Sequence, residues 1–93
     1  MTVTAIVLIK AHTDQVTDLA QRLVEVKGVS EVYSVAGRYD LIAIVRVHDN
    51  DELATVVSDR IRKIAGIAES ETLIAFRTFS RKEIEGTFSI GLD

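Results

Sequence analysis

The most chemically varied stretch of this chain is Gly37-Arg38-Tyr39-Asp40, a tetrapeptide between two apolar segments. A glycine can adopt a positive φ and leave backbone N–H groups open to a ligand. The carboxylate of Asp40 can accept hydrogen bonds from an ammonium group, whereas the guanidinium of Arg38 can bind a carboxylate. One short turn therefore offers complementary groups for a zwitterion. The alternative is a plain hairpin that needs Gly37 for its turn and Tyr39 for packing, and spacing alone does not separate the two.

Two histidines, His12 and His48, form the second candidate site. Each follows a predicted central strand at a matching position of an internal repeat, so their imidazoles could approach each other. With Asp14, Asp49 or Asp51 they could hold a divalent metal ion. The simpler interpretation places both side chains in water at strand ends, just before helices begin. We adopt it and predict no metal site and no cofactor.

No constellation of nucleophile and base is recognisable along the chain. The Ser, Thr and His residues stand in no elbow or triad context. No phosphate-binding glycine loop, dinucleotide fingerprint or HExxH metal motif occurs. We therefore predict that the protein is not an enzyme and has no catalytic residues.

Composition points to an oligomer. A chain of 93 residues fits one domain, and domains this small usually gain stability from disulfides, metals or oligomerisation. With 47% hydrophobic residues and no Cys, oligomerisation is the remaining route. A net charge of -3 and scattered basic residues argue against direct nucleic-acid binding. There is neither a membrane-length apolar run nor a secretory signal, so we expect a cytoplasmic protein without a membrane partner.

The spacing of apolar residues predicts six elements in the order β-α-β, β-α-β. The predicted strands are residues 3–10, 31–36, 41–48 and 72–79. The first helix is expected to begin at Thr13 and to end at Gly28. The second begins at a capping box formed by Asp49 and Glu52 and ends at Gly66. Its expected buried stripe consists of Leu53, Val57, Ile61 and Ile64.

The two halves repeat each other. Residues 10–12 (KAH) align with residues 46–48 (RVH) at an offset of 36 (46 minus 10). Residues 28–31 (GVSE) align with residues 66–69 (GIAE) at an offset of 38 (66 minus 28), which we assign to a longer second helix. A split βαβ repeat is typical of the ferredoxin-like βαββαβ fold, of the α+β class. Right-handed crossovers then place the first and third strands together at the sheet centre.

Both faces of the predicted sheet are apolar. Val7 and Ile9 alternate with Ile6 and Leu8 in the first strand, and residues 41–48 repeat this pattern. Two helices can cover only one face, and a contiguous apolar surface in water marks an interaction site. We expect the sheets of two chains to pack face to face in a homodimer. The alternative is a monomer with scattered exposed apolar residues.

Two motifs resemble those of a known family. The hairpin at Gly37, Tyr39 and Asp40 resembles the G-x-Y-D hairpin of the Lrp/AsnC regulators, which respond to leucine, asparagine and other amino acids. Residues 66–72 (GIAESET) are similar to that family's G-V-x-x-[ST]-x-T segment. With the βαββαβ order, the resemblance covers about residues 3–79 and matches the family's effector domain, called RAM.

The resemblance implies a dimeric α/β barrel whose dimers associate into tetramers, octamers or larger rings. It also implies a small effector, usually an amino acid, in a cleft between neighbouring dimers. The ligand-binding residues that it implies are Gly37, Arg38, Tyr39, Asp40, Ser70 and Thr72. Arg38 occupies the variable hairpin position, and Ser70 replaces a more usual Thr. Glu69 and Glu71 add negative charge nearby, which disfavours an acidic ligand.

The family's helix-turn-helix has no counterpart before the first predicted strand, so we expect a stand-alone RAM protein. It would consist of a ligand-binding and oligomerisation domain at residues 1–79 and a C-terminal arm at 80–93. Phe88, Ile90 and Leu92 alternate in that arm, which indicates a weak strand, and a frayed terminus is the alternative.

The expected role is to modulate transcription or amino-acid metabolism through assembly, alone or mixed with full-length Lrp/AsnC relatives. One alternative is a purely structural oligomer without a ligand. Another is a cofactor-free enzyme on the same barrel, whose active site would lie between the sheet and the helices of one subunit.

Overall fold

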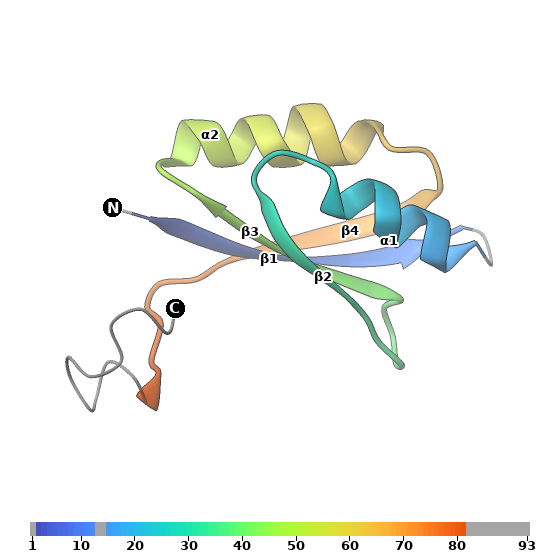
Figure 1. Cartoon of the computed structure of the whole chain (residues 1–93), viewed down its shortest axis with the longest axis horizontal. Coiled ribbons are helices and arrows are strands. Elements are labelled where there is room, and N and C mark those ends of the chain that lie inside the picture. The colour runs from blue at the N-terminus through green and yellow to red at the C-terminus, as the bar shows by residue number, and fades with distance from the viewer. Residues whose placement is uncertain (1, 13–14, 82–93) are drawn as a thin grey trace.

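The computed structural model describes residues 2–12 and 15–81. Its elements are β1 (Val3–Ala11), α1 (Val16–Val24), β2 (Val29–Ser34), β3 (Leu41–Val47), α2 (Asn50–Ala54), the π-helical segment η1 (Thr55–Arg60), the short 3-10 helix η2 (Ile61–Lys63) and β4 (Ile67–Ile74). The strands form one antiparallel sheet in the order β2-β3-β1-β4. The helical segments all lie on one side of it (Figure 1). The predicted ferredoxin-like α+β fold, with β1 and β3 at the centre, is confirmed.

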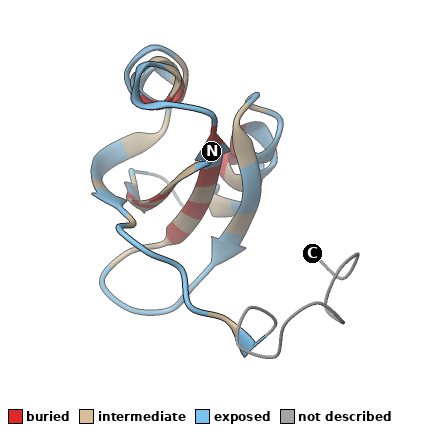
Figure 2. Ribbon diagram, turned by 90° about the vertical axis from the view of Figure 1, so that its left-hand side faces the viewer, coloured by how far each residue is buried: buried red, intermediate tan, exposed pale blue. Residues whose placement is uncertain are grey.

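The core lies between the sheet and the helices. Alternate residues of the central strands point into it, which gives the banded burial pattern seen in Figure 2. The buried residues are Ala5, Val7, Ile9, Leu19, Leu23, Leu41, Ala43, Val45, Val47, Leu53, Val56 and Ile61. All of them are aliphatic, and no buried polar side chain in the described residues lacks a hydrogen-bond partner.

The start of α2 follows the predicted capping box. The Asp49 carboxylate accepts a hydrogen bond from the Glu52 backbone N–H at 2.8 Å. The Glu52 carboxylate accepts one from the N–H of His48 at 3.0 Å, one residue earlier than in a standard capping box. Together these bonds satisfy two backbone donors and fix where the helix begins.

The predicted buried stripe of this second helix is partly wrong. Leu53 and Ile61 are buried as expected, but Val56 takes the core position assigned to Val57, which is only half-buried. The reason is the π-helical segment η1, whose wider turn shifts the side-chain register from that of an α-helix. Val56 then packs against the turn before β2, where a Cβ on Gly28 would lie 2.6 Å from a Val56 methyl group.

The predicted fourth strand, residues 72–79, is wrong in its bounds, because β4 runs from Ile67 to Ile74. As an edge strand, β4 tolerates polar residues at its start, and these hid it from an apolar pattern. Phe76 and Phe79, which extended the prediction, lie beyond the sheet and are 100% and 81% exposed. Similarly, β2 lies two residues earlier than predicted, at Val29–Ser34.

Some predictions fall on residues outside those that the structure describes. They are the cap at Thr13 and the alternating residues Phe88, Ile90 and Leu92 of the arm. Within the described residues, no helix is both long enough and apolar enough to cross a membrane.

Candidate functional site

The hairpin between β2 and β3 is held to the end of β1 by hydrogen bonds. The Asp40 N–H donates to the carbonyl oxygen of Ile9 at 2.9 Å, and the Asp40 carboxylate accepts from the N–H of Ala11 at 2.8 Å. The Lys10 ammonium group donates to the carbonyl of Arg38 at 3.3 Å. One oxygen of the Asp40 carboxylate is therefore engaged by the chain itself, and the other has no hydrogen-bond partner among the residues that the structure describes.

Tyr39 reaches from the hairpin to β4. Its hydroxyl donates to the Glu71 carboxylate at 2.8 Å. This hydrogen bond is the main cause that raises the pKa of Tyr39, with smaller contributions from burial and from the negative charge of Glu71. Glu71 pairs with Leu8, whose side chain points away from the helices, so the contact lies on the helix-free face of the sheet.

The two hydroxyl residues of the second motif lie on the opposite face. Ser70 pairs with Ile9 and Thr72 with Val7, and both of these partners are buried beneath the helices. Paired residues of antiparallel strands point to the same face. The structure therefore separates Ser70 and Thr72 from the Tyr39 hydroxyl, although all three were predicted to bind one ligand.

An open pocket of about 540 Å³ lies between β4 on one side and η1 and η2 on the other. Its lining residues are Val57, Ser58, Arg62, Ile67, Ala68, Glu69, Ser70 and Thr72. Ser70 and Thr72 are thus the predicted site residues that line this pocket, and the four hairpin residues are not part of its lining. We call this cavity the β4 pocket.

The side chains of the serines, the threonine and the arginine that line the β4 pocket have no polar partner among the described residues. Among the described residues, none forms a hydrogen bond or ion pair with the side chains of Ser58, Arg62, Ser70 or Thr72. The hairpin differs, because the Tyr39 hydroxyl and one Asp40 oxygen already have partners. Of the two regions, the β4 pocket offers more free donors to a ligand.

Sequence reasoning missed the η1 and η2 side of this pocket. Ser58 and Arg62 are four positions apart, as neighbours on a helix surface are, and this spacing was the available signal. The signal is weak, because many exposed helix positions show it. Only the folded structure reveals that these two residues line the same pocket as the hydroxyls of β4.

The helix-free face of the sheet is a second candidate surface, and we call it the open face. Ile6, Leu8, Ile42 and Ile44 lie half-buried at its centre, and Tyr33 and Leu73 flank them with 49% and 45% exposure. These six residues come from all four strands of the sheet. They form a continuous apolar surface of the kind that marks interaction sites.

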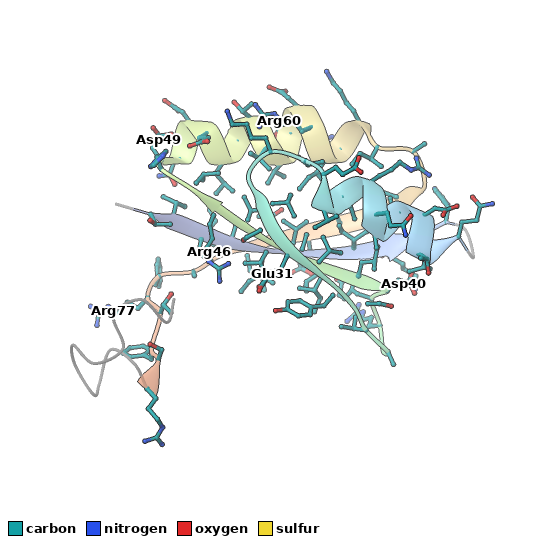
Figure 3. All side chains as sticks on the ribbon, in the orientation of Figure 1. Glu31, Asp40, Arg46, Asp49, Arg60 and Arg77 are labelled. Carbon is teal, nitrogen blue, oxygen red and sulfur yellow. The ribbon has the colours of Figure 1, made fainter. Side chains whose placement is uncertain are left out.

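Polar contacts border the open face. Figure 3 shows Glu31 and Arg46 on the side of the sheet away from the helices. Their side chains form an ion pair at 4.0 Å, and Arg46 also donates to the Ser30 hydroxyl at 2.9 Å. The Tyr33 hydroxyl donates to Glu31 at 2.9 Å, and this bond is the main cause that raises the pKa of Tyr33. An apolar centre with a polar rim is the usual anatomy of a protein interface.

The histidines do not form a common site. β1 and β3 are antiparallel, with Val3 opposite Val47, so His12 and His48 follow opposite ends of the sheet. The suggestion that their imidazoles approach each other is therefore wrong. In the described part of the chain, no group of three or more His, Cys, Asp or Glu residues is placed to hold a metal ion.

Comparison with known proteins places this arrangement in a family. The family model of the Lrp/AsnC ligand binding domain matches residues 4–84, which include the hairpin, the open face and the β4 pocket. The chain belongs to the Lrp/AsnC ligand-binding family. The two sequence motifs had predicted this membership, and it is confirmed.

Relatives of this Lrp/AsnC domain include a larger regulator and a protein of similar size. The HTH-type transcriptional regulator PH1916 of Pyrococcus horikoshii is 33% identical over 78 residues, which are 81% of this chain and 52% of the regulator. The chain thus spans about half the length of that relative. The crystal structure of TTHA0845 from Thermus thermophilus matches with a TM-score of 0.78 and 44% identity. That match covers 85% of this chain and 99% of TTHA0845.

A more distant structure shares the fold alone. The transcriptional regulator NMB0573 of Neisseria meningitidis, solved as a complex with L-methionine, matches with a TM-score of 0.74 at 11% identity. The match covers 84% of this chain and 52% of that regulator.

Proposed function

We propose that this Lrp/AsnC domain is an amino-acid effector-binding and assembly module without catalytic activity, and that the effector binds in the β4 pocket. The observation that supports this proposal best is the pocket itself. Its volume of about 540 Å³ lies within the range of small-molecule sites, about 300–1,000 Å³. Ser70 and Thr72, the hydroxyl residues of the family motif, point into it without partners among the described residues. The same fold accommodates L-methionine in NMB0573.

The assembly part of the proposal depends on the open face. A second copy of the chain would cover Ile6, Leu8, Ile42 and Ile44 and form a dimer with sheets face to face. Dimers would then associate further and bring the hairpin of one chain towards the pocket of another. In such a complex, Gly37 to Asp40 would complete the site from outside.

This arrangement suggests how binding could act. A ligand that contacts two subunits stabilises the larger assembly by mass action. Because PH1916 is an HTH-type transcriptional regulator with a homologous domain, mixed assembly with such regulators would connect the effector to transcription.

The packing of the chain weighs against the enzyme alternative. An active site between sheet and helices needs a general base there, but the twelve buried core residues are all aliphatic. The hydroxyls and the guanidinium on the helix-covered side of the β4 pocket do not supply one either. No such observation weighs against the alternative of a purely structural oligomer. Measurements of amino-acid binding distinguish that alternative from our proposal.

The test is calorimetric titration with each of the twenty amino acids, followed by light scattering with any that bind. We expect saturable binding of at least one amino acid and a shift in mass. Thr72→Val keeps the shape but removes a hydroxyl, so it should weaken binding about tenfold. The matched control is Thr17→Val on the exposed surface of α1, which should leave affinity unchanged. Asp40→Ala is a poorer test, because it also removes the bond to Ala11.

If no amino acid binds and the mass stays constant, the effector proposal is wrong. The structural oligomer would then be the better explanation of the open face.

A further inference from the structure

We infer that Arg62 binds the carboxylate of the effector, so that the β4 pocket selects small carboxylic acids as a class and does not require their amino group. This inference rests on the proposed function, because it assigns the chemistry of the same pocket.

Two charged residues line the β4 pocket, Arg62 and Glu69. Glu69 pairs with Lys10, whose side chain lies on the open face with those of Ile6 and Leu8. Strand alternation therefore directs the Glu69 carboxylate away from the helix-covered side on which Ser70 and Thr72 point. The remaining charge on the pocket side is the positive guanidinium of Arg62.

Arg62 is the arginine that lines the pocket, and its guanidinium is not engaged by the described residues as those of Arg46 and Arg60 are. Arg46 is engaged by Ser30 and Glu31, and Arg60 donates to the carbonyl oxygen of Lys27 at 2.9 Å, across to the turn before β2. Arg62 has no such partner among the described residues. A guanidinium beside a cavity, with its donors unused, is well suited to bind a carboxylate through two parallel hydrogen bonds.

The neighbouring groups extend this recognition. The hydroxyls of Ser58, Ser70 and Thr72 can each donate a hydrogen bond to a carboxylate oxygen. Val57 and Ile67 offer an apolar wall for a short aliphatic side chain. Among the residues that line the pocket, no carboxylate on its inner side is placed to accept from an ammonium group. The pocket therefore binds the acid end and the hydrocarbon part of the effector, and its amino group contributes little here.

The experiment uses three probes of matched shape: L-valine, 3-methylbutanoate, which lacks the amino group, and L-valinamide, which lacks the carboxylate. Binding to the full chain is measured by ¹H–¹⁵N NMR, so that shifts of the β4 and η1 amides locate the ligand. We expect both carboxylates to bind in the pocket and the amide to bind about 10–100-fold more weakly. Affinity for the carboxylates should fall as salt rises, because Arg62 is exposed.

The variant Arg62→Gln should weaken binding of both carboxylates by about 10–100-fold and leave the weak binding of valinamide unchanged. Its matched control is Lys63→Gln, which removes the same charge from the neighbouring exposed residue that does not line the pocket. That control should leave all three affinities unchanged. Both replaced side chains are exposed, so the fold should persist, as the NMR spectrum itself reports.

Equal affinity for valine and valinamide, or unchanged binding by Arg62→Gln, would overturn the role of Arg62 while leaving the effector proposal intact. Equal losses in Arg62→Gln and Lys63→Gln would also overturn it, since they would indicate a general effect of charge. If none of the three probes shifts the pocket amides, the proposed class of ligand is wrong. The titration with twenty amino acids then decides the proposed function separately.

Discussion

The two faces of the sheet are made from the same strands and similar residues, yet they differ in how far their side chains are buried. Val7 and Ile9 are fully buried, whereas their immediate neighbours Ile6 and Leu8, equally apolar, remain partly exposed in the single chain. The burial differs because α1, α2 and η1 pack on one face of the sheet only. Apolar content therefore does not determine burial by itself. The chain completes one core and leaves a second apolar surface that its described helices do not cover.

The difference between the two faces is tested most strongly by comparing the stability of the variants Ile9→Ala and Leu8→Ala. Ile9 is fully buried, so its truncation leaves a cavity and should lower the free energy of unfolding by about 2–5 kcal/mol. Leu8→Ala should cost less in a dilute monomer. If a second copy covers the open face, the loss in free energy of unfolding caused by Leu8→Ala should grow with protein concentration. Urea unfolding at two concentrations measures both effects, and equal costs at every concentration would contradict the distinction between the faces.

A charge on the open face gives the next largest effect. Ile44→Glu places a carboxylate at the centre of the proposed contact and should raise the dissociation constant of the dimer by about 100-fold. Val24→Glu, at a 47% exposed site on α1, is the matched control and should not change it. Light scattering over a dilution series provides the measurement. A mass that is the same for Ile44→Glu and the unsubstituted chain would place the interface elsewhere.

The smallest expected effect is at the rim of the open face. Both tyrosines of the chain, Tyr33 and Tyr39, donate to carboxylates, and their pKa values lie above the ordinary phenol value. Glu71→Ala removes the main cause at Tyr39 and should lower that pKa, while Tyr33 stays unchanged. Ultraviolet titration of the phenols shows whether one or both move.

The same shift has a consequence for stability. A phenol whose pKa is raised by folding contributes stability that is fully present below the unfolded pKa of about 10 and is lost as the pH rises through the folded pKa. The effect of Glu71→Ala on unfolding should therefore vanish at high pH. An effect that persists unchanged above both pKa values would assign it to something other than the hydrogen bond.

Local patterns in the sequence predicted the parts of the fold that local forces determine. The alternation around Val7 and Ile9 identified the core face, and Asp49 with Glu52 identified a helix start. The bounds of β4 could not be predicted this way, because an edge strand is held by its neighbour β1 and can be polar. Nor could the π-helical turn that buries Val56 next to Gly28, since the local spacing of apolar residues does not distinguish it from an α-helix.

The sequence predicted which residues belong to the candidate site but not how they are arranged in space. The motifs pointed to the hairpin and to Ser70 and Thr72, and the roles of all six predicted residues stay predictions. What sequence could not provide is the side of β4 on which each lies, because that depends on the register with β1. For the same reason Ser58 and Arg62, distant in sequence from both motifs, were not found.

The strand order also bears on how the protein is made. Of the four described strands, β1 is synthesised first and lies at the sheet centre, and its two neighbours are residues 41–47 and 67–74. Until β4 emerges, one edge of β1 stays unpaired, and such an edge is open to pairing with other chains. The final fold therefore awaits nearly the whole described chain, and truncation before Ile67 should yield an aggregating product rather than a smaller stable domain.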